Sequence, residues 1–224
     1  MGLTVNGGCP AFAAGRSRRL SEMARATALT ELTGRQFLGD IETYLAIYAD
    51  AMDADPALLP GRRELMLRHA GYSQFRAVHA QDVDSGLVAG FAYGFHGERG
   101  QWWYEAVWAA IKHSSGPDRA ASWLANCLEI AEVHVHSDQQ RAGIGTRMLM
   151  MLTSGRPERT AVLSTPDRDT TARRLYRRLG FSELLASYSF PGGSPPYVVM
   201  GAELPLRDPT AAPIRSLSAS PSIS

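Results

Sequence analysis

Cysteine and net charge are both scarce in this chain. Its 224 residues include only two cysteines, Cys9 and Cys127, and 23 basic side chains nearly balance 22 acidic ones. Two cysteines are too few for a disulfide framework, so we expect both thiols to be free. A formal net charge of +1 creates no long-range field for nucleic acid or an anionic membrane, and we expect neither as a partner.

Long apolar runs are also missing. No run approaches the roughly 18 residues of a membrane-spanning helix, and the first residues lack the apolar core of a secretion signal. We therefore expect a cytoplasmic protein. A content of 45% hydrophobic and 20% charged residues is ordinary for a globular chain that buries one core.

The composition divides the chain into one domain and two flanking segments. Residues 1–33 mix Gly, Ala, Ser and Arg, with a weak helical pattern at 20–32, and we expect a mobile extension there. The content of Pro, Ala and Ser near the other end predicts a disordered tail over residues 207–224. The domain is therefore expected over residues 34–206.

Hydrophobic periodicity within this domain predicts a mixture of helices and strands, an α/β class. We expect strands at 36–38, 75–80, 87–95, 129–135, 161–165, 181–190 and 197–204, and helices at 41–52, 60–69, 100–113, 144–149 and 171–179.

The most informative stretch follows the strand that ends at Val135. A polar turn leads through Gly143 and Gly145 into an apolar helical pattern. The first N–H groups of a helix lack partners and carry partial positive charge, and glycine lets the backbone approach an anion closely. The loop therefore predicts a phosphate or pyrophosphate site. Its side-chain donors would be Gln140, Arg141 and Thr146.

Two familiar phosphate motifs are absent from this loop. A dinucleotide fingerprint needs a third glycine where Met148 stands, and a P-loop needs Gly-Lys-Ser/Thr. Instead, Gln140-x-x-Gly143-x-Gly145 after a strand resembles motif A of the GNAT N-acetyltransferase superfamily. In that family the motif binds the pyrophosphate of acetyl-CoA.

A second segment shows the same resemblance. Residues 171–179 predict a helix closed by Gly180, with Tyr176 on its apolar face. The run from Ala172 to Phe181 (ARRLYRRLGF) resembles the A-x-x-L-Y-x-x-L-G-F segment that follows the fifth strand of GNAT enzymes. With both motifs in this order, the chain is identified as a member of the family. The resemblance implies a central mixed, largely antiparallel sheet with flanking helices.

The resemblance also implies a reaction, in which a primary amine of a small molecule or protein attacks acetyl-CoA directly within a ternary complex. We expect acetyl-CoA as the acetyl donor, no metal, and a monomer or homodimer. The implied cofactor-binding residues are Val133, His134, Val135, Gln140, Arg141, Ala142, Gly143, Ile144, Gly145, Thr146 and Asp169. Many members carry Asn where Asp169 stands, so an amide donor is lost there. The alternative is a non-catalytic CoA-binding or regulatory module with the same fold.

Glu129 and Glu132 are the candidate catalytic bases. A base is needed because an alkyl amine is only about one part in a thousand neutral near pH 7.4, a deficit of roughly 4 kcal/mol. In a regular strand the two side chains would face opposite ways, but the family's fourth strand carries a bulge that shifts this parity. We favour Glu129, which lies eleven residues before Gln140, a spacing at which several members carry a proton acceptor. The alternative is that either glutamate is a solvated strand residue or an ion-pair partner.

Tyr176 is implied as the proton donor to the departing thiolate, with a core tyrosine as the alternative. His134 and His136 share a strand face, either as a metal pair or as ordinary strand-end histidines. Four arginines on the last predicted helix can either reach the 3′-phosphate of CoA or stay solvated. These are Arg173, Arg174, Arg177 and Arg178.

Aromatic residues are concentrated in residues 100–108. Trp102, Trp103 and Trp108, with Tyr104, can line an acceptor pocket, or they can pack a local helix onto the core.

Overall fold

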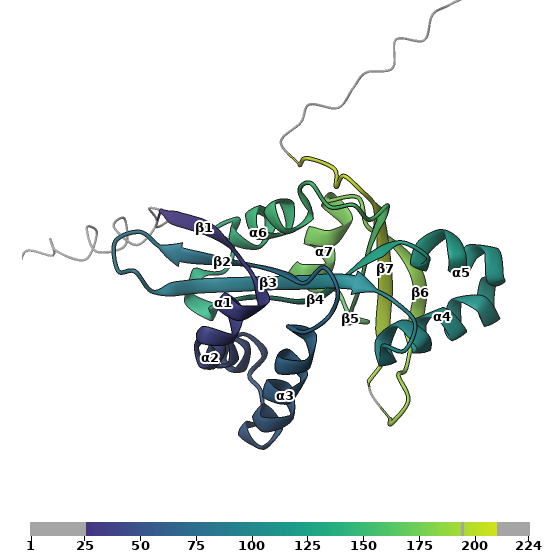
Figure 1. Ribbon diagram of the computed structural model, residues 1–224, viewed down its shortest axis with the longest axis horizontal. Coiled ribbons are helices and arrows are strands. Elements are labelled where there is room, and N and C mark those ends of the chain that lie inside the picture. The colour runs from purple at the N-terminus through teal and green to yellow at the C-terminus, as the bar shows by residue number, and fades with distance from the viewer. Residues whose placement is uncertain (1–25, 194, 210–224) are drawn as a thin grey trace, which may run out of the picture.

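The fold is built on a mixed sheet with the strand order β1-β2-β3-β4-β5-β7-β6 (Figure 1). The computed structural model describes residues 26–193 and 195–209. In chain order the elements are β1 (Thr27–Leu32), α1 (Gly34–Gly39), α2 (Ile41–Met52), η1 (Pro56–Leu58), α3 (Leu59–His69), β2 (Arg76–Asp82), β3 (Val88–Gly97), α4 (Trp102–Ser115), α5 (Pro117–Leu124), β4 (Cys127–Val135), η2 (Ser137–Gln139), α6 (Ile144–Thr153), β5 (Thr160–Pro166), α7 (Thr171–Arg178), β6 (Ser182–Tyr188) and β7 (Tyr197–Glu203).

The pairing within the sheet is largely antiparallel. Strands β4 and β5 run parallel, whereas the other neighbouring pairs run antiparallel. The expected mixed sheet with flanking helices is therefore confirmed. No helix in the described ranges is both long and apolar enough to cross a bilayer.

Helices cover both faces of the sheet (Figure 1). Helices α6 and α7 bury Met148 and Tyr176 against one face. On the opposite face, α1–α3 pack on β2 and β3 around Phe37, and α4 and α5 pack on β5 and β7 around Val107. Strand β4 therefore lies beneath the boundary between these two groups of helices.

The sheet begins earlier than the sequence indicated. Strand β1 is formed by Thr27–Leu32, ahead of the domain start expected at Gly34, and it pairs antiparallel with β2. The weak helical pattern at 20–32 was therefore misleading over its last residues. Pairing with a strand about fifty residues later overrides a weak local preference. Residues 1–25, with Cys9, and the predicted tail from residue 210 onward lie outside the described ranges.

The strand expected at 36–38 is wrong, because these residues lie in α1. The Thr33 hydroxyl accepts a hydrogen bond from the Gln36 backbone N–H, and the Gln36 side chain accepts one from the Thr33 backbone N–H. This capping box satisfies two N–H groups at the start of the helix. The Thr-x-x-Gln spacing was present in the sequence and could have predicted the helix.

The helix predicted at 171–179 is confirmed as α7, Thr171–Arg178. Gly180 adopts a φ of +98°, and the Phe181 N–H reaches back to the Tyr176 carbonyl. The left-handed backbone conformation at this position disfavours residues that carry a side chain. Glycine therefore ends the helix, and the chain then turns back into β6.

Candidate active site

Strands β4 and β5 pair over a short length and then separate. Their pairing covers Cys127–Glu129 of β4 and Thr160–Val162 of β5. Beyond it, β4 continues to Val135 with no partner on that side among the described strands. The backbone N–H and C=O groups of this free edge can pair with an extended ligand. Glu129 lies where the two strands part.

A bulge in β4 decides which way the side chains of this edge point. Tyr93 of β3 pairs with Glu132 and the next residue, Gly94, pairs with Ile130, so Ala131 is the extra residue. A Cβ at position 94 would approach the Glu129 carbonyl oxygen to 2.5 Å, so this pairing requires glycine. The expected change of parity is therefore present in β4.

The bulge turns both glutamates toward the face covered by α1–α5. Leu128 and Ile130 pack on the α6 and α7 side before the bulge, and Val133 packs there after it. Glu129 and Glu132 therefore point to the other side, and they are 5% and 6% exposed. Both candidate bases lie in the same interior region.

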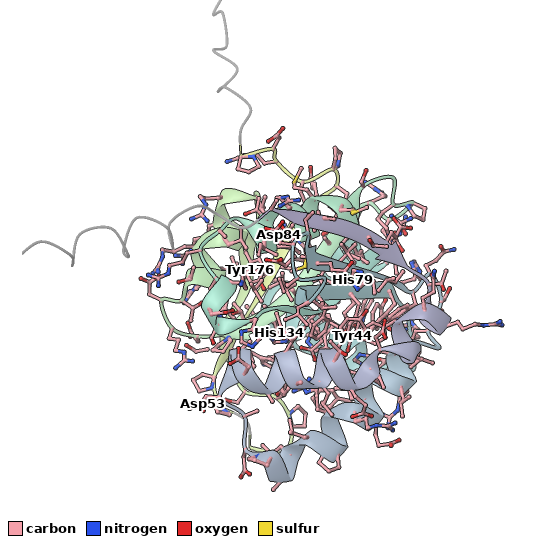
Figure 2. All side chains as sticks on the ribbon, turned by 90° about the vertical axis from the view of Figure 1, so that its left-hand side faces the viewer. Tyr44, Asp53, His79, Asp84, His134 and Tyr176 are labelled. Atoms are coloured by element: carbon pink, nitrogen blue, oxygen red, sulfur yellow. The ribbon has the colours of Figure 1, made fainter. Side chains whose placement is uncertain are left out.

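Glu132 is held by two partners. Its carboxylate accepts a hydrogen bond from Arg62 of α3 and another from His134 of β4. Burial opposes ionisation, but the hydrogen bond and charge of His134 and the charge of Arg62 outweigh it and lower the pKa of Glu132. His134 in turn contacts the edge of Tyr48, at 5.1 Å between ring centroids, and lies beside α2 (Figure 2). Glu132 is therefore a fixed anion.

Glu129 has no such partners. No side-chain hydrogen bond to Glu129 occurs within residues 26–193 and 195–209, and its Oε2 atom is fully buried. Burial alone raises the pKa of this carboxyl to about 8. Glu129 can therefore exchange a proton near neutral pH, as a general base must.

Tyr176 lies on the other side of β4, on α7. Its ring is 7% exposed and packs on Phe181, at 5.7 Å between centroids. Burial and the negative charge of Glu132 raise the pKa of Tyr176. The hydroxyl therefore stays protonated and can donate a hydrogen bond, although it is a weaker acid than a free phenol.

The loop from Gln140 to Gly143 leads directly into α6. Arg141 and Gly143 adopt φ values of +67° and +77°, and α6 begins at Ile144. The N–H groups of the first turn have no partner within the helix. Nothing lies within 4 Å of a Cβ built at Gly143. The Gln140 side chain does not point to this site, because it donates to the Val135 carbonyl at 3.1 Å.

The contact that holds the beginning of this loop was not predicted from the sequence. Asp50, near the end of α2, accepts hydrogen bonds from the backbone N–H and the hydroxyl of Ser137, at 2.6 and 3.0 Å. His136 pairs with Asp138 at 2.8 Å, so His134 and His136 serve different carboxylates. Within the described residues, no group of three or more His, Cys, Asp or Glu side chains is placed to hold a metal ion.

The three tryptophans expected to line an acceptor pocket lie in different surroundings. Trp103 donates from Nε1 to the Ser164 hydroxyl of β5 at 3.1 Å, beyond the point where β4 and β5 part. Trp108 stacks on Tyr104 beneath the Arg99 guanidinium, and Trp102 is 59% exposed next to Phe190. Of these three tryptophans, Trp103 is therefore the one that is anchored to β5, where β5 no longer pairs with β4.

Three of the four arginines on α7 form ion pairs, with side chains that are half exposed in Arg174 and Arg177 and 13% exposed in Arg173. Arg173 pairs with Asp167 and Glu183, and Arg177 also pairs with Glu183. Arg174 pairs with Asp169, whose side chain is 71% exposed. These contacts favour the solvated-face interpretation, and they direct the Asp169 carboxylate toward Arg174.

Known proteins resemble this chain over most of its length. The family described as "Acetyltransferase (GNAT) domain" matches residues 82–183. A GCN5-like protein acetyltransferase of Mycobacterium tuberculosis is 32% identical over 193 residues, which cover 75% of this chain and 92% of that protein.

Solved structures share the fold at low sequence identity. The ribosomal-protein-S18-alanine N-acetyltransferase of Escherichia coli has a TM-score of 0.55 at 16% identity, over 84% of this chain and 99% of its own. NAA60 of Arabidopsis thaliana, in complex with a bisubstrate analogue, has a TM-score of 0.54 at 16% identity, over 80% of this chain and 98% of its own.

Proposed function

Because this chain belongs to the GNAT acetyltransferase family, we propose that it transfers an acetyl group from acetyl-CoA to a primary amine by direct attack within a ternary complex. The supporting observation is the gap between β4 and β5 with an unpaired, buried glutamate where the strands part. The β4 edge left unpaired beyond this point can bind an extended ligand beside that proton acceptor.

The β4 edge and the α6 loop would hold acetyl-CoA. The backbone of Val133–Val135 can pair with the extended pantetheine arm, as an added strand does. The N–H groups at the start of α6, between Gly143 and Thr146, can bind the diphosphate. The cofactor would then place its thioester beyond the paired part of β4.

Glu129 would accept the proton of the acceptor amine, directly or through a water molecule. The amine nitrogen then forms a bond with the carbonyl carbon, and the bond from that carbon to sulfur breaks. The leaving thiolate receives a hydrogen bond from Tyr176 and takes up a proton as free CoA. Trp103 would contribute an aromatic wall to the acceptor site.

The acceptor is proposed to be a small amine, with a protein amine as the second candidate. The second candidate has support from the Mycobacterium tuberculosis relative, which is named a protein acetyltransferase. We place the enzyme in the cytoplasm, as a monomer or homodimer.

The function is tested by mixing the purified protein with acetyl-CoA and amines, and following the release of free thiol. The panel should contain polyamines, amino acids, aminoglycosides, lysine peptides and peptides with free N-termini. We expect release with at least one acceptor class. Tight CoA binding without release for every class would instead indicate a non-catalytic module.

Replacing Tyr176 with phenylalanine is expected to lower kcat by about 10²-fold, because the leaving sulfur loses its donor. The dissociation constant of acetyl-CoA, measured by calorimetry, should not change. Tyr44→Phe is the matched control, since Tyr44 is also a buried tyrosine but bonds to His79, away from Tyr176 (Figure 2). If Tyr176→Phe weakens cofactor binding as much as turnover, the residue has a structural role.

A further inference from the structure

Arg62 lies between α3 and the buried glutamate of β4. Its Nη1 atom donates to Oε1 of Glu132, and its guanidinium carbon lies 4.5 Å from the centre of the Tyr48 ring. The side chain keeps 30% of its surface exposed, whereas that of Glu132 keeps 6%. Arg62 therefore reaches from the partly exposed surface of α3 to the buried carboxylate of β4.

The neighbouring residue of α3 behaves differently. Arg63 pairs with Glu42 of α2, whose side chain is 69% exposed. Both arginines belong to the same turn of the same helix, but only Arg62 of the pair reaches β4. The chain thus offers an internal comparison between a buried and an exposed guanidinium ion pair.

Several titratable or charged groups from five elements interact with the Glu132 carboxylate or with the groups next to it. They are Tyr48 of α2, Arg62 and His69 of α3, Tyr93 of β3, Glu129 and His134 of β4, and Tyr176 of α7.

Most of these groups are neutral near pH 7. Burial lowers the pKa of His69 to about 4, and its Nδ1 is 3.0 Å from the Tyr93 hydroxyl. Burial also raises the pKa of Tyr93 and of Tyr176. A guanidinium keeps its charge at every pH in the working range. Arg62 is therefore the permanent cation of the set.

We propose that Arg62 is a positioning residue that separates the roles of the two buried glutamates. Its guanidinium holds Glu132 as an anion locked against His134, which leaves Glu129 as the carboxylate that takes the proton of the acceptor amine. This inference deepens the proposed function and rests on it for its catalytic meaning. The protonation state that it predicts for Glu132 in the free protein does not depend on any substrate.

The pairing explains how two carboxylates on one strand face can act differently. A buried carboxylate without a cation becomes protonated rather than staying charged, as the burial of Glu129 illustrates. Without Arg62, Glu132 would retain only its hydrogen bond with His134 of these two contacts. It should then take up a proton at a higher pH and compete with Glu129.

The protonation of both glutamates can be measured by infrared spectroscopy of the free protein. The carboxylic acid C=O band is followed from about pH 5 to about pH 10, where ordinary carboxyls are already ionised. In the parent protein we expect one carboxyl to titrate in this range, and Glu129→Gln should remove it. In Arg62→Gln we expect a second titrating carboxyl, which the added change Glu132→Gln should remove.

Arg63→Gln is the matched control, because it removes the same charge from the same helix. It should leave the parent titration unchanged. The proposal is overturned if Arg62→Gln adds no band, if Arg63→Gln adds the same band, or if the band survives in the double variant with Glu132→Gln.

Arg62→Lys covers the case in which Arg62→Gln does not fold by circular dichroism. Lysine keeps the charge but loses the planar fork, so a smaller shift in the same direction is expected. A shift in a folded Arg62→Lys protein as large as that expected for Arg62→Gln would count against the proposal, because lysine retains the charge.

The catalytic consequence is measured separately by the pH dependence of kcat. Arg62→Gln should lower kcat near pH 7 by about tenfold and alter the shape of the profile, whereas Arg63→Gln should change neither. An unaltered profile in Arg62→Gln would show that Arg62 does not act in turnover. If the parent itself shows no turnover, the proposed function fails while the infrared result still decides the protonation of Glu132.

Discussion

Replacing Glu129 with glutamine is expected to reduce kcat by about 10³-fold, within the usual range for loss of a general base. Glutamine keeps the size of the side chain but cannot accept the proton of an ammonium ion. Near pH 7.4 this leaves the reaction dependent on the small neutral fraction of the amine. Affinity for acetyl-CoA should be unchanged, because the β4 edge and the α6 loop remain intact.

A pH profile of kcat separates this role from a structural one. The parent rate should rise as Glu129 ionises around pH 8, and this ionisation should be missing in Glu129→Gln. A variant with near-parent kcat would remove Glu129 from the mechanism, and the same loss in acetyl-CoA affinity as in kcat would make its role structural.

Glu129 should also leave a signature in stability, independent of any substrate. Its pKa is raised from 4.5 in the unfolded chain to about 8 in the fold. Between these values the folded state binds more protons, so the stabilisation is complete below about pH 4.5 and is lost as the pH rises to about 8.

The expected slope is at most about 1.4 kcal/mol per pH unit over this window. Glu129→Gln cannot titrate, so its stability relative to the parent should increase with pH. Urea denaturation of both proteins at several pH values measures the difference. Parallel pH curves would show that Glu129 ionises normally in the fold.

Replacing Gly143 with valine is expected to weaken acetyl-CoA binding by about 100-fold or more. Gly143 has a φ of +77°, which a β-branched residue resists. The added methyl groups would also fill space that is empty around Gly143, next to the start of α6 where the diphosphate is proposed to bind. Loss of one or two hydrogen bonds to a charged phosphate, at about 1.5–3 kcal/mol each, accounts for this magnitude.

Gly155→Val is the control for backbone strain. Gly155 has a φ of +63° and likewise has nothing within 4 Å of a built Cβ, but it follows the other end of α6. Both variants should lose similar folding stability, and only Gly143→Val should lose affinity in calorimetric titration with acetyl-CoA. Equal affinities in the two variants would place the diphosphate away from this loop.

Much of the fold was predictable because its signals are local. The α6 loop, the Gly180 helix end and the strands predicted at 75–80 and 87–95 each depend on residues a few positions apart, and the structure contains all of them. Thr33 and Gln36 show that one further local signal was missed. Strand β1 was not predictable in this way, because its partner β2 is distant in the chain.

The positions of the candidate site residues followed the sequence-based expectation, whereas their partners did not. Glu129, Glu132 and Tyr176 all lie on or next to β4, as the resemblance implied. The partners of Glu132 and of the α6 loop were not foreseen. Arg62 contacts a residue 70 positions away, and Asp50 contacts one 87 positions away.

The sequence alone therefore determined the family, the order of most elements and the glycine-rich start of α6, because periodicity, capping and turn chemistry act between residues close in the chain. Only the tertiary structure decided which glutamate is anchored and which is unpaired. Both side chains have the same intrinsic chemistry. They differ because the fold brings Arg62 and His134 to Glu132 and surrounds Glu129 with groups that offer its carboxylate no hydrogen bond.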